Sequence, residues 1–307
     1  MEPLLFLCHR LPYPPNKGDK IRSFHLLKHL STRYKIYLGT FIDDPVDVQY
    51  VPTVASYCEQ LLALTITPRL RRAASLRGLL SGEALGLPYY RDARMREWVA
   101  QIWQQVQPRK VLVYSSTMAQ YIEGARYATA RRVVDFVDVD SEKWRAYAAE
   151  QRGPMAWIYG REARLLRRYE QRIAAEVDAS VFVSAAEAQV FRDFAGVAPE
   201  TIHAADNGVD SEYFAPDPNL PNPYPRAASV VVFTGAMDYW ANVDAVSWFA
   251  HDILPLVHAQ MPTVEFWIVG ARPTPAVRQL ASLAQVSVTG SVADIRPYLQ
   301  HAALAVA

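Results

Sequence analysis

Residues 229–270 read SVVVFTGAMDYWANVDAVSWFAHDILPLVHAQMPTVEFWIVG, and this stretch decides the fold class. An apolar, β-branched run at 230–233 precedes an amphipathic segment at 243–257, and a second apolar run occupies 266–269. Short apolar runs of this kind are typical of buried strands, whereas a longer amphipathic segment is typical of a helix. The order therefore predicts strand, helix and strand, which is the βαβ unit of a parallel sheet.

Both predicted strands end in a glycine, Gly235 and Gly270. In parallel sheets ligands bind beyond the carboxyl ends of the strands, where the N-termini of helices attract anions. A glycine at such a place lets the backbone approach a ligand closely. The alternative, that both glycines are ordinary turn residues, stays open at this point.

Strand and helix signals alternate through the rest of the chain, so we predict an α/β protein. Strands are predicted at 4–8, 36–41, 62–67, 111–114, 132–138, 181–184, 286–289 and 304–307. Helices are predicted at 46–61, 69–80, 92–106, 155–175 and 185–194. The segment 214–225 contains five prolines and predicts a linker. We therefore divide the chain into a first domain at 1–210, a linker at 211–228 and a second domain at 229–307.

The stretch 233–242, FTGAMDYWAN, together with later motifs, resembles the start of the donor-binding domain of a family 4 glycosyltransferase. The closer resemblance is to the sugar transferases associated with bacterial exopolysaccharide systems. The motifs that carry it further are Trp248-Phe249, 253–255, 266–270, 286–290, Val292, Asp294, 296–298, 207–210 and 135–144. The resemblance covers essentially the whole chain.

This resemblance implies a GT-B fold, in which two Rossmann-like domains carry parallel sheets. It implies transfer of a sugar from a nucleotide-sugar donor to a glycan or lipid-linked acceptor, with retention at the anomeric carbon and without a metal or cofactor. The donor-binding residues that it implies are Gly18, Gly235, Asn242, Gly270, Arg272, Gly290 and Val292. On the acceptor side it implies Lys17, Asp19, Arg22 and Asp135.

The sequence departs from that family in the loop after Gly235. Familiar members place an arginine and a lysine there to hold the diphosphate of the donor, whereas residues 237–242 read MDYWAN. Backbone amides and Asn242 must then replace these two cations. Family members also continue beyond the last predicted strand with a helix that carries two glutamates. We therefore expect a truncated chain with an incomplete second domain, and we expect this form to be inactive.

The loop 9–19 contains three prolines and joins the first predicted strand to a helix. Asp19 is predicted to cap that helix, and Gly18 lies at the junction, where free amides could meet a phosphate or carboxylate. Family 4 enzymes have a glycine-containing loop here, and Lys17, Gly18, Asp19 and Arg22 match its position. A surface loop without a ligand is the alternative.

An acidic cluster follows the strand predicted at 132–138 and consists of Asp135, Asp138, Asp140 and Glu142, with Lys143 beside it. Carboxylates at the end of a buried strand resist burial unless they are paired or face a cleft. The spacing of Asp138 and Asp140 could hold a divalent cation. We favour a metal-free role in which Asp138 and Lys143 are catalytic: a carboxylate orients acceptor hydroxyls and Lys143 offsets its charge. Helix capping by Asp140 and Ser141 is an alternative.

The formal net charge of +1 predicts no nucleic-acid partner. Residues 61–132, however, contain twelve Arg or Lys against four Asp or Glu. A basic face at 69–132 would suit peripheral contact with an anionic membrane or a phosphorylated acceptor, and a solvated helix face is the alternative. Cys8 and Cys58 show no metal spacing and indicate a reduced compartment. We expect a cytoplasmic protein at the inner face of the membrane.

The sequence contains no G-x-G-x-x-G, no P-loop and no G-x-S-x-G motif, which argues against a dehydrogenase, an NTPase or an esterase. Two alternatives to a glycosyltransferase stay open. One is a nucleotide-sugar epimerase of the same architecture. The other is a non-catalytic module that binds a glycan or a membrane.

Overall fold

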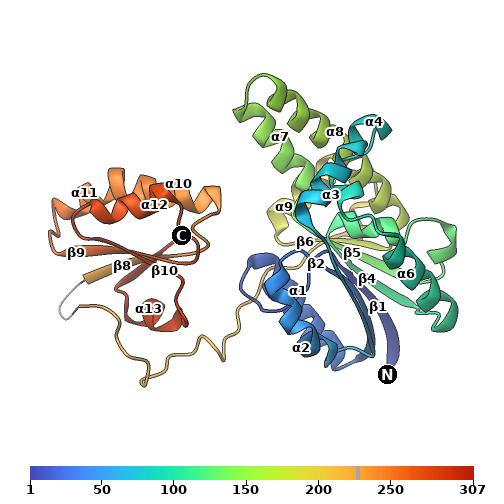
Figure 1. Ribbon diagram of the computed structural model, residues 1–307, viewed down its shortest axis with the longest axis horizontal. Coiled ribbons are helices and arrows are strands. Elements are labelled where there is room, and N and C mark those ends of the chain that lie inside the picture. The colour runs from blue at the N-terminus through green and yellow to red at the C-terminus, as the bar shows by residue number, and fades with distance from the viewer. Residues whose placement is uncertain (226–228) are drawn as a thin grey trace. The chain divides into compact units, whose positions relative to one another are not determined.

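The computed structural model describes residues 1–225 and 229–307, apart from the side chains of residues 77 and 80 (Figure 1). The chain forms two compact units, Met1–Gly208 and Val209–Ala307. Each unit is built around a parallel sheet with helices packed on it, so the predicted α/β class with two Rossmann-like domains is confirmed, and the second domain is the smaller.

The sheet of the first unit has seven parallel strands in the order β3-β2-β1-β4-β5-β6-β7. The strands are β1 Glu2–Cys8, β2 Tyr34–Ile42, β3 Gln60–Thr65, β4 Lys110–Tyr114, β5 Arg131–Val137, β6 Ala179–Phe182 and β7 Ile202–Ala204. The strand order reverses between β1 and β4. In open parallel sheets this switch point leaves a crevice beyond the carboxyl ends of the strands, where ligands bind.

Helices cover both faces of this sheet, which explains why β1 is apolar on both sides (Figure 1). Leu5 and Leu7 belong to the core on one face, whereas Phe6 and Cys8 belong to the core on the other, and all four side chains are fully buried. The α-helices of this unit are α1 Gly18–Ser31, α2 Val51–Ala55, α3 Pro68–Ser75, α4 Arg77–Ser81, α5 Gly86–Tyr89, α6 Ala93–Gln105, α7 Asp140–Glu150, α8 Pro154–Glu176 and α9 Ala185–Ala195.

The sheet of the second unit has the order β10-β9-β8-β11, with all neighbours parallel. Its strands are β8 Ser229–Thr234, β9 Val264–Val269, β10 Val286–Gly290 and β11 Leu304–Val306. Its α-helices are α10 Trp240–Trp248, α11 Leu254–His258, α12 Pro275–Gln279 and α13 Arg296–His301. The βαβ unit predicted from 229–270 is present as β8, α10 with α11, and β9. A π-helical turn, Phe249–Ile253, joins the two helices, because Pro255 cannot donate a backbone hydrogen bond.

The predicted linker does not run free of the second unit. Tyr224 is buried, and its hydroxyl donates a hydrogen bond to the carbonyl of Tyr298, at 2.6 Å, in α13. The amide of Asp217 donates to Gln300 at 2.8 Å, also in α13. The side chains of Gln300 and His301 in α13 also contact backbone carbonyls of the segment, at Asp217 and Leu220. Residues 226–228 of the predicted linker lie outside the described residues.

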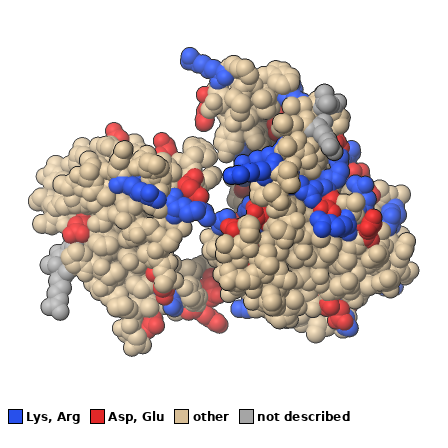
Figure 2. Space-filling view, viewed as in Figure 1, with Lys and Arg blue, Asp and Glu red and all other residues tan. Residues whose placement is uncertain are grey.

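Some of the basic residues predicted to form a face at 69–132 are engaged in local contacts. Lys and Arg gather on the side of the first unit shown in Figure 2. Arg71 and Arg94 share the carboxylate of Asp92, and Arg91 pairs with Glu83. Arg132 is buried, and its guanidinium donates to the carbonyls of Ile122 and Glu176. Contact of this region with a membrane stays a prediction.

Candidate active site

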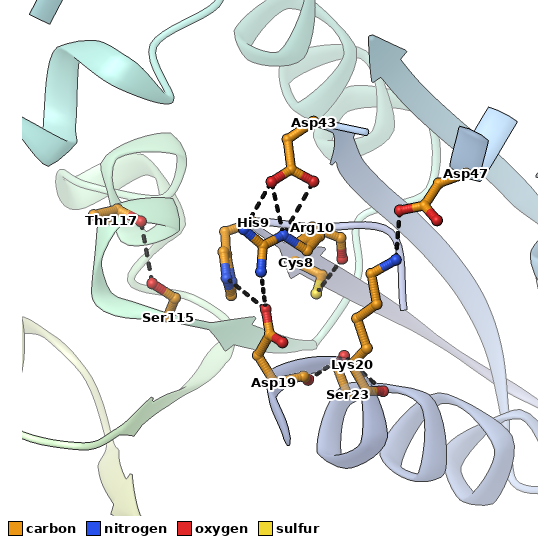
Figure 3. Close-up of polar contacts among 10 residues, drawn as sticks. All are labelled: Cys8, His9, Arg10, Asp19, Lys20, Ser23, Asp43, Asp47, Ser115 and Thr117. Atoms are coloured by element: carbon orange, nitrogen blue, oxygen red, sulfur yellow. Dashed lines mark hydrogen bonds and ion pairs between the residues drawn. The ribbon is translucent and has the colours of Figure 1, made fainter. Parts of the chain in front are cut away.

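The carboxyl edge of the first sheet gathers charged side chains around Arg10, the second residue after β1 (Figure 3). The Arg10 guanidinium donates from Nε to Asp43 at 2.9 Å and from Nη1 to Asp19 at 2.5 Å. Burial alone would raise the pKa of Asp19, but the neighbouring His9 and Arg10 outweigh it and lower that pKa below its usual range. Asp19 is therefore a fixed negative charge at the switch point.

Asp19 does not cap α1, contrary to the prediction. The helix begins at Gly18 with Lys17 at the N-cap position, and no side chain caps it. A capping residue turns its side chain toward the helix amides. The Asp19 carboxylate binds Arg10 instead. A Cβ on Gly18 would meet no atom within 4 Å. Gly18 and Lys17 thus lie at an open junction beside the charged cluster.

Arg22 and Asp135, both predicted on the acceptor side, form an ion pair. Nε of Arg22 donates to the Asp135 carboxylate at 2.8 Å, and the two side chains are 9% and 4% exposed. Nη1 of Arg22 also donates to the carbonyl of Ala205 at 2.7 Å, just after β7. Burial raises the pKa of Asp135, and the bond from Arg22 opposes this effect. The pair therefore ties α1 to the ends of β5 and β7.

The predicted catalytic residues Asp138 and Lys143 also lie together. Nζ of Lys143 is 2.5 Å from Asp138 Oδ2 and 3.5 Å from Asp140 Oδ1. Helix α7 begins at Asp140, but neither Asp140 nor Ser141 caps it with a side chain. Among the residues that the structure describes, no group of three His, Cys, Asp or Glu side chains is placed to hold a metal ion.

Two non-glycine residues at this edge have strained backbones. Ser115 follows β4 with φ of 76°, and Val137 ends β5 with φ of 72°. Left-handed φ is unfavourable for a β-branched residue such as Val137, and such strain costs about 1–3 kcal/mol per residue. The amide of Ser115 bonds the carbonyl of Asp135 at 2.8 Å, so the two strained turns are adjacent. Strain of this kind collects at functional sites.

In the second unit the predicted glycines Gly235, Gly270 and Gly290 end β8, β9 and β10. A Cβ on Gly270 would lie 1.7 Å from the carbonyl oxygen of Gly235. The amide of Gly270 bonds the carbonyl of Gly290 at 3.2 Å. Close backbone packing therefore requires glycine at Gly270 whether or not a ligand binds. Gly290 has φ of 74°, which also favours glycine.

Asn242 and Arg272 are the predicted donor-site residues with polar side chains in the second unit. Nδ2 of Asn242 donates to the carbonyl of Ala236 at 3.0 Å and so braces the loop after β8. Nε of Arg272 lies 2.6 Å from Asp238 in the same loop. Val292 follows β10 by two residues. Arg272 thus places a positive charge beside the loop after β8, where members of the resembled family carry an arginine and a lysine.

A groove of about 500 Å³ lies beside this loop. Its lining residues are Asp238, Trp240, Val243, Asp244, Ser247 and Thr274. The groove lies along the first turns of α10, whose N-cap residue Tyr239 makes no side-chain hydrogen bond to the helix. Such amides attract anions, and Arg272 lies against the same loop through Asp238.

Sequence analysis missed three residues of the first unit: Arg10, Asp43 and Glu170. Arg10 and Asp43 each directly follow or nearly follow a buried strand, and that position was the available signal. Glu170 lies in the middle of α8 with no such signal. Its side chain is fully buried and accepts hydrogen bonds from the amide and hydroxyl of Ser141, at the start of α7.

Burial raises the pKa of Glu170 to about 8, although the bonds from Ser141 oppose this effect. The folded protein therefore favours the protonated carboxyl, and its stability falls as pH rises from the ordinary glutamate range toward that value. Glu170→Gln keeps a donor and an acceptor for Ser141 without the charge. We expect its stability advantage over the wild type to grow by about 3 kcal/mol between about pH 5 and about pH 8.

Urea denaturation at both pH values measures this difference. Glu142→Gln is the matched control, because Glu142 lies on α7 beside Ser141 and is partly exposed. A pH dependence that is the same for Glu170→Gln and the wild type would contradict the assignment of Glu170.

The second unit resembles a known protein family, and the whole chain resembles solved structures. Residues 228–307 match a family model described as Glycosyl transferases group 1. No curated protein sequence matches the chain significantly. The second unit therefore carries the signature of a glycosyltransferase domain, and the match spans the loops of Gly235, Gly270 and Gly290.

Solved structures with a similar fold extend over nearly the whole chain. Sucrose-phosphate synthase from Thermosynechococcus elongatus superimposes with a TM-score of 0.62 at 15% identity, covering 99% of this chain and 75% of that one. The N-terminal domain of trehalose-6-phosphate phosphatase from Candida albicans gives 0.60 at 12% identity, with 99% and 76% coverage. A glycosyltransferase from Rickettsia africae gives 0.55 at 11% identity, with 99% and 72% coverage.

At these identities the likeness shows the fold, which is of the GT-B type. Together with the family match on the second unit, it supports a glycosyltransferase that uses a nucleotide sugar. Among the described residues no helix is long and apolar enough to cross a membrane.

Proposed function

We propose that this protein transfers a sugar from a nucleotide-sugar donor to a glycan or lipid-linked acceptor in exopolysaccharide biosynthesis. The single observation that carries the proposal is the glycosyl transferase family match on residues 228–307. The bond between the anomeric carbon and the diphosphate breaks, and its electron pair leaves with the diphosphate. The acceptor oxygen forms the new bond and loses its proton. We propose retention at the anomeric carbon, and we propose that no metal or cofactor takes part.

The donor site that we propose consists of the loop after β8 and the loop after β9. A leaving diphosphate needs fixed dipoles or cations where its charge develops. The N-terminus of α10 supplies the helix dipole, and Arg272 supplies the cation. Arg272 would exchange Asp238 for a phosphate oxygen, and so take the part of the arginine and lysine that residues 237–242 lack.

Arg272→Gln should weaken the binding of UDP or GDP about tenfold or more, because a charge-assisted hydrogen bond to phosphate is lost. Isothermal titration calorimetry of the full chain at fixed ionic strength measures the two affinities. Arg278→Gln is the control, since Arg278 is exposed on the neighbouring helix α12. Equal losses in both variants, or none in Arg272→Gln, would remove Arg272 from the donor site.

The activity itself is tested by incubating the full chain with radiolabelled nucleotide sugars and with membrane or glycan extracts as acceptor. The proposal expects acceptor-dependent release of the nucleoside diphosphate and label in a new glycoside, and this result would overturn the inactivity expected from the sequence. Binding of the donor with interconversion of its sugar would indicate the epimerase instead. Glycan or lipid binding with no donor binding would indicate the non-catalytic module.

We also propose peripheral contact with an anionic membrane, through α3 and α4 and not through the whole of 69–132. Leu70, Leu76 and Leu79 are 69%, 57% and 38% exposed, and Arg69 and Arg72 are exposed beside them. Exposed leucines among arginines suit an anionic membrane, which has an apolar interior and a negatively charged surface.

Changing Leu70 and Leu76 together to Gln should reduce binding to vesicles containing phosphatidylglycerol at least about tenfold, because two buried leucines contribute about 1.5–3 kcal/mol each. Co-sedimentation with such vesicles, and with pure phosphatidylcholine vesicles, measures the effect. Leu256→Gln is the matched control, since Leu256 is 66% exposed on α11 of the second unit. Vesicle binding that Leu70 and Leu76 do not affect would contradict this contact.

A further inference from the structure

His9 is the residue of the first-unit edge to which the proposed function gives no role. It directly follows β1, and its ring stacks on Tyr114 with centroids 5.8 Å apart and an interplanar angle of 9°. Tyr90 meets the ring edge-on at 5.7 Å. Two aromatic neighbours therefore fix the plane of the imidazole (Figure 3 shows the ring beside Asp19 and Arg10).

Asp19 orients this imidazole. Asp19 Oδ2 lies 3.6 Å from Nε2 of His9, which is longer than a hydrogen bond, so the contact acts mainly through charge. Arg10 holds the carboxylate from the other side, and Asp43 holds Arg10. Of the two neutral tautomers, a fixed negative charge facing Nε2 favours the one with its proton on Nε2. In that tautomer Nδ1 is a hydrogen-bond acceptor.

Nδ1 is the unusual atom of the ring. It is buried and has no hydrogen-bond partner among the described residues. The hydroxyl of Tyr114, on the ring against which His9 stacks, is likewise buried and without a partner there. A buried polar atom without a partner costs about 1–3 kcal/mol, and native proteins keep few of them. Two such atoms at one switch point, beside the strained turn at Ser115, indicate a place that a ligand completes.

The charges around His9 select the kind of ligand. Asp19 faces the ring from α1, and Asp140 acts on it electrostatically from α7. Arg10 is already neutralised by two carboxylates, and Lys143 by Asp138 and Asp140. An anionic ligand would be repelled here, whereas a neutral hydroxyl would find an acceptor in Nδ1.

We propose that His9 Nδ1 accepts a hydrogen bond from a hydroxyl of a neutral sugar bound by the first unit, with Asp19 as the residue that sets the tautomer. This inference rests on the proposed function, because it assigns part of the acceptor site. His9 is then a substrate-binding residue, and Asp19 is a positioning residue that acts through it.

The test uses the full chain labelled with ¹⁵N-histidine and two-bond ¹H–¹⁵N spectra of the rings. The probes are methyl pyranosides of glucose, galactose, mannose and N-acetylglucosamine, with inorganic phosphate as the anionic probe. His9→Phe, which keeps an aromatic ring for stacking, assigns the His9 signals by their loss. The exposed His203 of β7 is the internal control.

We expect the Nε2–H tautomer for His9 in the wild type and a mixture of tautomers in Asp19→Asn. At least one methyl pyranoside should shift the Nδ1 signal of His9 saturably and leave His203 unchanged. His9→Phe should reduce the affinity for that glycoside about tenfold, measured on the ligand signals. A proton on Nδ1, no shift with any of the four glycosides, or a shift with phosphate alone would overturn the proposal.

This outcome is separable from that of the donor site. Nucleoside diphosphate binding in the second unit does not involve His9, so calorimetry with UDP and GDP reports on the proposed function alone. A shift at His9 without diphosphate binding would retain a sugar site and reject the transferase. Diphosphate binding without a shift would reject only the role of His9.

Discussion

Gly270→Ala should destabilise the second unit by more than about 3 kcal/mol, the largest loss we expect from one methyl group. The new Cβ would lie 1.7 Å from the carbonyl oxygen of Gly235 and 2.8 Å from its carbonyl carbon. Both atoms are backbone, so no side-chain rotation can relieve the overlap. Strands β8 and β9 would have to separate where the amide of Gly235 bonds the carbonyl of Val269.

Gly290→Ala is the matched control within the same unit. Its Cβ would meet no atom within 4 Å, but its φ of 74° is unfavourable for alanine, at a cost of about 1 kcal/mol. Urea denaturation with hydrogen exchange read separately for the two units measures both variants. Equal losses in Gly270→Ala and Gly290→Ala would contradict the close packing of the two strand ends.

Arg22→Met should destabilise the first unit by about 3–5 kcal/mol, because it leaves the Asp135 carboxylate buried and unpaired. Asp135 is 4% exposed, and its carboxylate also accepts a hydrogen bond from the backbone amide of Val137 at 3.1 Å. Methionine keeps most of the length and apolar volume of the arginine side chain, so the loss reports mainly on the charge. The same change frees the carbonyl of Ala205.

A double-mutant cycle separates these contributions. Adding Asp135→Asn to Arg22→Met should recover a large part of the loss, because the uncompensated charge is gone. Arg192→Met is the control: Arg192 donates to the carbonyl of Ile202 at 2.7 Å and has no carboxylate partner among the residues that the structure describes, so we expect a loss of about 1 kcal/mol. Additive effects of Arg22→Met and Asp135→Asn would show that the pair is not coupled.

The periodic parts of this fold were predictable from the sequence. The stretch 229–270 gave the βαβ unit, and the helix expected at 155–175 is α8, Pro154–Glu176. Long apolar patterns specify burial, and burial decides these elements. The helix expected at 46–61 is instead a 3-10 helix, Pro45–Tyr50, then the short α2, then β3 from Gln60. Pro52 cannot donate a helical hydrogen bond to the preceding turn, so one continuous helix does not form. The edge strand β3 then begins within the predicted helix.

The charged pairs of the site were much less predictable. Arg22 and Asp135 were both expected on the acceptor side, but their pairing joins residues 113 positions apart. Arg10 and Asp43 meet only because β1 and β2 are adjacent and parallel. Asp19 was expected to cap α1 because it lies at the start of that helix. Its carboxylate instead binds Arg10 on the preceding loop. Local patterns cannot show such competition between distant partners.

The central claim is that the second unit binds the diphosphate of a nucleotide sugar at the loops after β8 and β9. Amide chemical-shift mapping of the ¹⁵N-labelled full chain with UDP-glucose and GDP-mannose tests it most directly. We expect at least one of these two nucleotide sugars to shift the amides of 235–243 and 270–274 saturably, and we expect Arg272→Gln to weaken this binding. No saturable shift in these two loops with either nucleotide sugar would contradict it.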